Sequence, residues 1–242
     1  MSAILASIQW DLLSLTPPGW GGNLLRGLAK TFQIALGAYV LGLTIGLAGA
    51  LGKIYGGPVL RWGLEIYTTL IRAVPELVLI LLLYYAGTDL LNQALEGVGY
   101  ERVDISGLAA GIYVLGLVQG AYATEVLRGA ILAVPVGQVE AAAAFGMSWV
   151  QRHSRIVIPA MIPFALPGLA NLWLIVTKDT ALLAVVGFSE LALETRQAAG
   201  ATKSYFMFYV IAAMLYLLLT LVSNVVFRWI EHRYRRGQPE LN

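Results

Sequence analysis

The sequence predicts an all-α integral membrane protein with five transmembrane helices, and three observations support this fold class. Of the 242 residues, 58% are hydrophobic and 12% are charged, whereas soluble domains carry about 25% charged residues. The mean hydropathy of the chain is +0.73. Several uncharged stretches reach about 20 residues, the length that an α-helix needs to cross a bilayer. We therefore expect one membrane domain, with little chain left for a soluble one.

The positions of the helices follow from where charged residues are missing. Four stretches have no charge, and a fifth apolar region carries Arg72 and Glu76, so we interpret it as a span with a buried ionic feature. The uncharged stretches are Thr31–Gly52, Ile105–Thr124, Ile156–Thr177 and Phe206–Phe227, and the fifth region is Tyr67–Gly87. The expected spans are, approximately, residues 31–52, 66–87, 105–127, 160–188 and 206–229.

Two patterns predict how these helices pack. Glycines four residues apart let helix backbones approach closely in lipid. The fourth span contains Pro159, Pro163 and Pro167, which remove backbone donors, so we expect an irregular or kinked helix where it begins. Such a backbone either lines a cavity or reflects strain in the scaffold. The glycine pairs are Gly42 with Gly46, Gly107 with Gly111, and Gly116 with Gly120.

The segment between the third and fourth spans, residues 133–159, is patterned well enough to have its own structure. Pro135 and Gly137 predict the end of the preceding helix, and the stretch Gln138–Phe145 is rich in strong helix formers. Gly146 predicts the end of this short helix.

A second short helix is expected directly after the first one. Ser148 and Gln151 have the spacing of a capping box, in which each residue hydrogen-bonds to the backbone of the other. Two short helices joined at a glycine predict a compact, projecting loop. The alternative is an amphipathic loop that lies on the lipid surface.

The distribution of Lys and Arg predicts the orientation in the membrane, because these residues collect on the cytoplasmic side. Basic residues are concentrated in the tail, residues 233–242, and in the 133–159 loop, which are separated by two spans. We expect both to be cytoplasmic and, with five spans, the N-terminal segment 1–22 to be extracytoplasmic. Arg26 and Lys30 argue for the opposite orientation unless they belong to a separate interfacial helix.

The 133–159 loop also carries a family resemblance. The segment EAAAAFGMSWVQRHSRIVIPAMIPFALP resembles the EAA loop of type I ABC importer permeases, with Glu140, Ala141 and Gly146 at its most characteristic positions. The stretches YTTLIRAVPELVLILLLYY, GAYATEVLRGAILAVPVGQVEAA and KDTALLAVVGFSEL extend the resemblance over nearly the whole chain. It is similar to the polar amino acid permeases, and most of all to those for histidine, lysine, arginine, ornithine and opines.

This resemblance implies that residues 23–232 form a type I ABC transmembrane domain in the inner membrane of a bacterium. It implies pairing with a second permease subunit, a paralogue or a copy of this chain, and with two cytoplasmic ABC ATPase subunits. A periplasmic or lipid-anchored binding protein would deliver the amino acid. Small alanines allow close approach by the ATPase, and the aromatic rings can anchor it, as buried aromatic residues do in interfaces. The residues expected to couple the permease to the ATPase are Glu140, Ala141, Ala142, Phe145, Gly146 and Trp149.

The sequence does not contain the phosphate-binding motif G-x-x-x-x-G-K-[ST], because Gly52 and Lys53 are followed by Ile54. We therefore expect ATP and Mg²⁺ to be used by the partner ATPase, with no catalytic residue and no directly bound cofactor in this chain. Cysteine is absent, and His153 and His232 have no further ligand at metal-site spacing, so we expect no metal. The net charge of +2 gives no indication of a nucleic-acid partner.

Four charged residues within the spans are candidates for the substrate pathway. Arg72 and Glu76 are four residues apart, which places them on one face if the helix is continuous, with Glu65 on roughly the same side. Glu76 then either meets a cationic substrate or is neutralised by Arg72 in a structural pair, and we favour the pair. Lys178 and Asp179 project to different faces, and the resemblance implies a role in the gate or in helix packing more than in substrate selection.

The leading interpretation is a permease subunit that forms half of the translocation pathway for polar amino acids, with cationic amino acids or opines as the leading substrate class. The alternatives are a permease for other polar amino acids such as glutamine or glutamate, a secondary transporter, and a membrane scaffold. A secondary transporter is usually built from repeated sets of spans, which five spans do not show. A scaffold does not need a structured internal loop.

Overall fold

The computed structural model describes residues 10–101 and 106–234. This part of the chain consists of helices joined by turns and contains no β-strand, which confirms the all-α class. The helices are η1 (Trp10–Leu13), α2 (Gly21–Tyr55), α3 (Pro58–Ala73), α4 (Glu76–Gly97), α5 (Gly107–Leu132), α6 (Val136–Ala144), α7 (Trp149–Arg152), η2 (His153–Val157), α8 (Ile158–Asp179), η3 (Thr180–Val186), α9 (Leu191–Thr202) and α10 (Tyr205–Tyr234).

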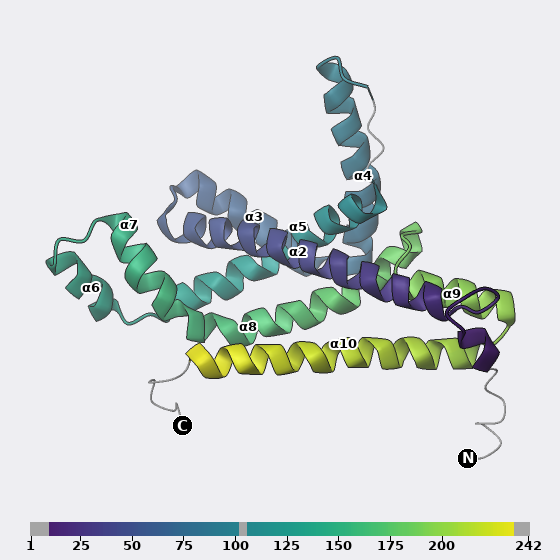
Figure 1. The fold of residues 1–242 in the computed structure, drawn as a ribbon. Coiled ribbons are helices and arrows are strands. Elements are labelled where there is room, and N and C mark those ends of the chain that lie inside the picture. The colour runs from purple at the N-terminus through teal and green to yellow at the C-terminus, as the bar shows by residue number, and fades with distance from the viewer. Residues whose placement is uncertain (1–9, 102–105, 235–242) are drawn as a thin grey trace.

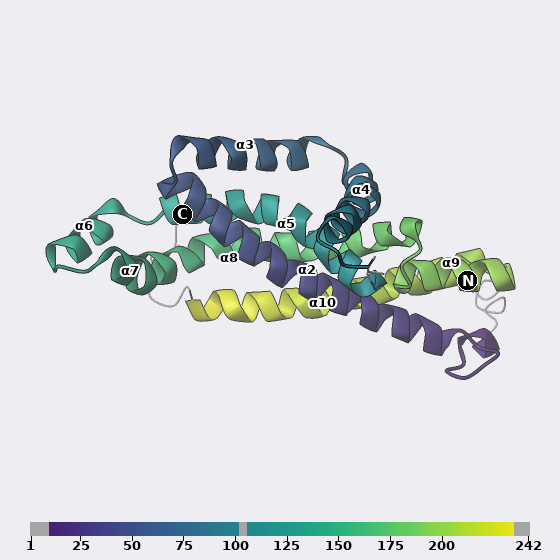
Figure 2. The same ribbon diagram turned by 90° about the horizontal axis from the view of Figure 1, so that it is seen from above.

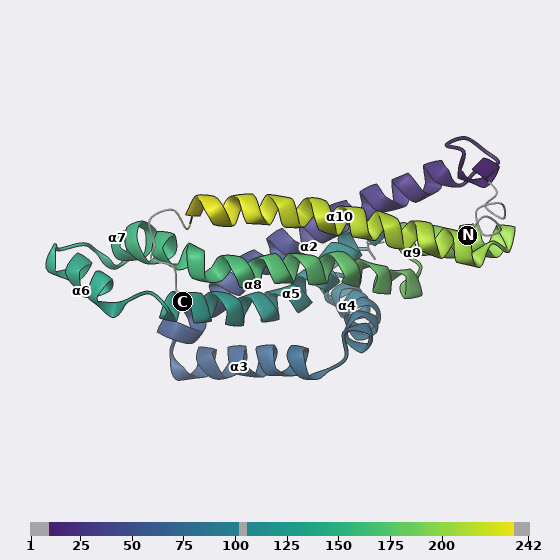
Figure 3. The same cartoon turned by 90° about the horizontal axis from the view of Figure 1, so that it is seen from below.

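Four long helices, α2, α5, α8 and α10, run side by side along one axis and form the bundle (Figure 1, Figure 3). The helices α6 and α7 project from one end, which we call the loop end, and α9 lies at the opposite end. Five helices of the described chain are long and apolar enough to cross a membrane. This agrees with the predicted number of spans.

The first span is longer than expected. It forms one continuous helix, α2, that begins at Gly21 and ends at Tyr55. Arg26 and Lys30 lie in the first turns of this helix and not in a separate interfacial helix. Helix α2 packs tightly on α5 because two glycines leave no room for a side chain. A Cβ atom at Gly46 would lie 2.5 Å from the Cβ of Ala123. Gly42 and Gly46 therefore form the small-residue face that the sequence predicts.

The expected second span, residues 66–87, is not a single helix. The chain breaks at Val74 and Pro75, between α3 and α4, because a residue that precedes proline disfavours the α conformation. Helix α3 runs back along the bundle, whereas α4 stands across it, upright in Figure 1 and seen end-on in Figure 2. Arg72 and Glu76 therefore belong to different helices, and the prediction that they share a helix face is wrong.

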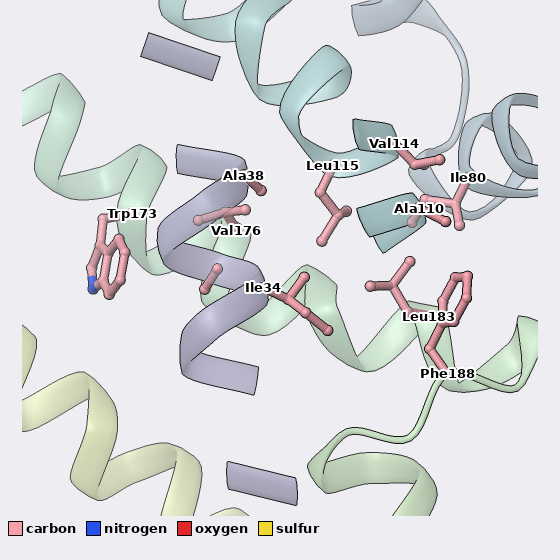
Figure 4. Close-up of a cluster of buried hydrophobic side chains, with 11 residues drawn as sticks. Ile34, Ala38, Ile80, Ala110, Val114, Leu115, Trp173, Val176, Leu183 and Phe188 are labelled. Atoms are coloured by element: carbon pink, nitrogen blue, oxygen red, sulfur yellow. The ribbon is translucent and has the colours of Figure 1, made fainter. Parts of the chain in front are cut away.

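A buried apolar cluster holds the middle of the bundle together. In Figure 4, Ile34 of α2, Leu115 of α5 and Leu183 of η3 point toward one another. Trp173 of α8 belongs to the same cluster, and its indole Nε1 donates to the hydroxyl of Ser223 in α10 at 2.8 Å. The clustered side chains tie four segments together and leave the polar indole nitrogen satisfied.

The loop of residues 133–159 folds as two short helices, as predicted. Gly146 joins them with φ of 76°, a left-handed conformation that favours glycine. Ser148 Oγ accepts from the backbone of Gln151 at 3.3 Å, and the Gln151 side chain accepts from the backbone of Ser148 at 2.9 Å, so the capping box is complete. The prediction for Gly137 is wrong, because this residue lies inside α6.

The fourth span begins irregularly, as its prolines predict. A π-helical turn, η2, connects α7 to α8, and the backbone N–H of Ile158 donates to the carbonyl of His153 across it. Helix α8 then continues through Pro163 and Pro167.

Candidate functional site

Several residues of the 133–159 loop present an accessible surface at the loop end. Phe145 is 86% exposed. Glu140, Ala141 and Gly146 are also exposed. Ala142 differs, because it is only 4% exposed and belongs to the inner face of α6. The surface available to a partner is therefore narrower than the sequence suggests.

Trp149 has two environments. Its ring is partly exposed, but one face stacks on the imidazole of His153, with ring centroids 4.0 Å apart. Tyr55, at the end of α2, contacts both rings edge-on. The sequence offers no further metal ligand near His153, and in the structure its imidazole packs against Trp149 and Tyr55. Within the described part of the chain, no group of three or more His, Asp or Glu side chains could hold a metal ion.

A second candidate site lies where α4, α5 and α8 meet. Glu76 is the first residue of α4, Asp179 is the last residue of α8, and both are half-buried. Tyr122 of α5 is close enough to interact electrostatically with both carboxylates, and its hydroxyl donates to Glu76 Oε1 at 3.5 Å. Glu76 and Asp179 are close enough to interact electrostatically. Three helices therefore bring two carboxylates and a phenol together within the membrane-spanning part of the chain.

The cations near this site do not neutralise it by direct contact. Arg72, at the end of α3, is exposed and forms no ion pair with Glu76 among the described residues. The expected structural pair is therefore not formed. Lys178 is exposed and forms no ion pair with Asp179 in the part of the chain that the structure describes, although the two charges are close enough to interact electrostatically. This agrees with the prediction that adjacent residues on a helix project to different faces.

The sequence analysis missed an ionic cluster near the loop end. Lys53 Nζ, on a residue 6% exposed, donates to Glu65 at 2.6 Å, to Glu125 at 2.6 Å and to the hydroxyl of Thr68 at 2.7 Å. Glu65 was expected on roughly the same side as Arg72 and Glu76, but the break at Pro75 places Glu65 and Glu76 on different helices. Glu125 also accepts from Arg128, three residues later in α5, at 2.9 Å. The sequence signal that could have predicted this cluster is Lys53, a single charge at the end of an apolar helix.

A buried carboxylate at the opposite end of the bundle was also missed. Glu190 is fully buried, and it accepts hydrogen bonds from Thr31 at 3.1 Å, from Tyr216 at 3.0 Å and from the backbone of Leu193 at 2.9 Å. It caps α9 and joins this helix to α2 and α10. Burial raises the pKa of the Glu190 carboxyl, although these hydrogen bonds lower it again in part.

A bundle of apolar spans, an intramembrane polar site and a structured loop at one end together define the membrane-spanning subunit of a transporter. The chain belongs to the family described as binding-protein-dependent transport system inner membrane component, which it matches over residues 23–236. It is accordingly an inner membrane component, and it is a permease subunit of an amino acid ABC importer.

Curated relatives support this assignment over almost the full chain. The histidine/lysine/arginine/ornithine permease protein HisQ of Salmonella typhimurium is 42% identical over 219 residues, which cover 90% of this chain and 96% of the relative. The nopaline permease protein NocQ of Agrobacterium fabrum is 41% identical over 235 residues, covering 96% and 98%. The octopine permease protein OccQ of Rhizobium radiobacter is 38% identical over 228 residues, covering 94% and 96%.

A solved structure shows the same fold. It is described as an amino acid ABC transporter with histidines, and one of its chains superimposes with a TM-score of 0.74 at 29% sequence identity. The match covers 88% of this chain and 95% of that chain.

Proposed function

We propose that this permease transports cationic amino acids or opines, and that Glu76 and Asp179 bind the positively charged group of the substrate. The observation that carries this proposal is the convergence of two carboxylates on Tyr122, with neither carboxylate ion-paired in the described chain.

The electrostatics of the site support a cationic substrate. Unneutralised carboxylates within the membrane are costly, and two of them close together repel each other. A guanidinium or ammonium group placed between Glu76 and Asp179 would relieve both costs, and the phenol of Tyr122 would remain available for a hydrogen bond. A glutamate side chain would add a third negative charge to the site. A glutamine side chain is uncharged and would not compensate the two carboxylates. Relatives named for histidine, lysine, arginine, ornithine, octopine and nopaline transport are consistent with this choice.

For the assembly, we propose that a second permease, either a paralogue or a copy of this chain, completes the pathway. Two ABC ATPase subunits dock at the loop end through Glu140, Ala141, Phe145 and Gly146, where Phe145 is the exposed anchor. A substrate-binding protein delivers the amino acid at the opposite end. The loop end and the tail are cytoplasmic, and the N-terminus is outside. This chain is non-catalytic and binds no cofactor, because ATP and Mg²⁺ are bound and used by the partner ATPase.

The mechanism that follows is alternating access. The ATPases move the 133–159 loop when they close on ATP, and the paired bundles reorient around the central site. ATP hydrolysis by the ATPases supplies the driving force, and the difference in affinity of the two conformations for nucleotide and for the loaded binding protein determines which conformation is favoured at each stage. In the inward state the substrate leaves Glu76 and Asp179 for the cytoplasm.

The test uses the complete importer in proteoliposomes and compares Glu76→Gln with Asp179→Asn. Losing a hydrogen bond to a charged group costs about 1.5–3 kcal/mol, so we expect the concentration of arginine needed for half-maximal transport to rise roughly 10- to 150-fold. Protein abundance and basal ATP hydrolysis should be retained. Asp89→Asn is the matched control, because Asp89 is an exposed carboxylate further along α4. Unchanged arginine transport in both variants would remove the two carboxylates from the substrate pathway.

A further inference from the structure

The 133–159 loop makes one direct polar contact with the end of α2. The hydroxyl of Tyr55, the last residue of α2, lies 2.8 Å from Nε2 of His153. His153 Nδ1 lies 2.8 Å from the backbone carbonyl of Trp149. His153 is only 7% exposed, and the three rings of Tyr55, Trp149 and His153 are in mutual contact.

The hydrogen bonds fix which atom of the imidazole carries its proton. A carbonyl oxygen can only accept, so Nδ1 of His153 carries a hydrogen and donates it to Trp149. In the neutral imidazole Nε2 is then an acceptor, and the hydroxyl of Tyr55 donates to it. Both ring nitrogens are therefore used, and the ring cannot rotate without breaking a bond.

The backbone places this imidazole in a special position. His153 is the first residue of the π-helical turn η2, between the short helix α7 and the span α8. Turns of this kind interrupt an α-helix and are frequent at functional sites. The contact therefore joins the end of α2 to a distant part of the sequence, at the place where the loop continues into α8.

An apolar cluster beside the contact makes the junction stiff. Val157 of η2 and Met161 of α8 are buried together with Leu127 of α5 and with Val134, which follows α5, and Ile54 of α2 packs against them. Packed interiors of this type move as units and do not deform continuously. Lys53, two residues before Tyr55 on α2, ties the same helix end to α3 and α5.

We propose that Tyr55 and His153, with Trp149 stacked above, form a fixed joint that transmits movement of the 133–159 loop to α2. The inference rests on the proposed function of the loop as the ATPase docking site. Tyr55 and His153 are positioning residues: they touch neither substrate nor nucleotide, and they determine how much of the loop movement reaches the membrane bundle. The exposed anchor Phe145 binds the ATPase, whereas the joint acts after binding.

The experiment measures the number of arginine molecules transported per ATP hydrolysed by the complete importer in proteoliposomes. Tyr55→Phe removes only the hydroxyl. Because a hydrogen bond of this kind shifts an equilibrium by about 2- to 12-fold, we expect the ratio to fall roughly 2- to 12-fold. ATPase association and basal hydrolysis should be unchanged. Tyr39→Phe is the matched control, because the hydroxyl of Tyr39 also leaves α2, donating to the carbonyl of Leu169 in α8 at 3.0 Å.

Two further experiments test the proposed joint and the proposed docking surface separately. If Tyr55 acts through His153, the double variant Tyr55→Phe with His153→Leu should lower the ratio no further than His153→Leu alone. Additive effects, an unchanged ratio in Tyr55→Phe, or an equal loss in Tyr39→Phe would overturn the joint. Loss of ATPase association in Phe145→Ala tests the docking surface separately. Retained association in that variant would contradict the proposed function of the loop. The joint would still be judged by the transport ratio measured for Tyr55→Phe.

Discussion

Lys53 of α2 and Glu125 of α5 form an ion pair of 2.6 Å in which the cation is almost completely buried. The same ammonium group binds Glu65, whose side chain is 65% exposed. Lys53 thus holds three helices together at the loop end, only two residues before the tyrosine of the proposed joint. Removing one partner of such a pair is destabilising because it leaves the other charge without compensation where water cannot reach it.

Lys53→Met should destabilise the importer by about 1–3 kcal/mol, because Met keeps the length of the side chain but leaves acceptors without a donor. The loss should be smaller than the roughly 3–5 kcal/mol of a fully buried broken pair, since Glu65 is exposed and Arg128 still neutralises Glu125. Thermal unfolding in detergent measures the effect. Glu65→Gln is the control and should cost about 0–1 kcal/mol. Equal losses in the two variants would contradict the importance of the buried cation.

Glu190 should make the stability of the chain depend on pH. A carboxyl whose pKa is raised on folding binds its proton more tightly in the folded state. Its contribution to stability is therefore greatest below the ordinary carboxyl pKa of 4.5 and is lost as the pH rises through the raised value. We expect the melting temperature of the wild type, relative to that of Glu190→Gln, to increase as the pH is lowered from about 8 to about 5. A difference that stays constant or falls over this range would show that burial does not dominate at Glu190.

Gly146 should tolerate asparagine but not valine. Its φ of 76° is left-handed, a conformation that costs an ordinary residue about 1–2 kcal/mol. A Cβ atom at this position would meet nothing within 4 Å, so the cost comes from the backbone alone. Gly146→Val should weaken co-purification of the ATPase, and Gly146→Asn should retain it. The control is Gly129→Val, at an equally open glycine with an ordinary φ in α5. Full ATPase binding and transport in Gly146→Val would contradict the role of this turn.

The orientation can be tested directly because the chain has no cysteine. Gln151→Cys and Gln238→Cys should be shielded from an impermeant thiol reagent in intact cells, whereas Lys203→Cys should react. Lys203 is exposed in the turn between α9 and α10, so a cysteine at this position is accessible to the reagent when this end of the bundle is outside. Reaction of Gln238→Cys from outside would invert the topology.

The short-range features of this protein could be predicted because their causes are local. Uncharged length predicts the membrane helices, and the residues at 146, 148 and 151 predict a turn and a helix start within a few positions of themselves. The break at Pro75 had a local signal as well, since proline restricts the residue before it. Apolar content on both sides of Pro75 outweighed that signal, and the second span was expected to be continuous.

By itself, the sequence determined the membrane class, the number of spans and the loop between the third and fourth spans, because hydropathy and helix signals act over neighbouring residues. Only the tertiary structure decided which polar groups meet. Lys53 and Glu125 are 72 positions apart, Tyr55 and His153 are 98 apart, and Thr31 and Glu190 are 159 apart. These partners depend on how whole helices pack, and close packing is set by side-chain shape along the full length of each contact. A buried charge in a helix shows that a partner exists, while the packing of the bundle selects which residue it is.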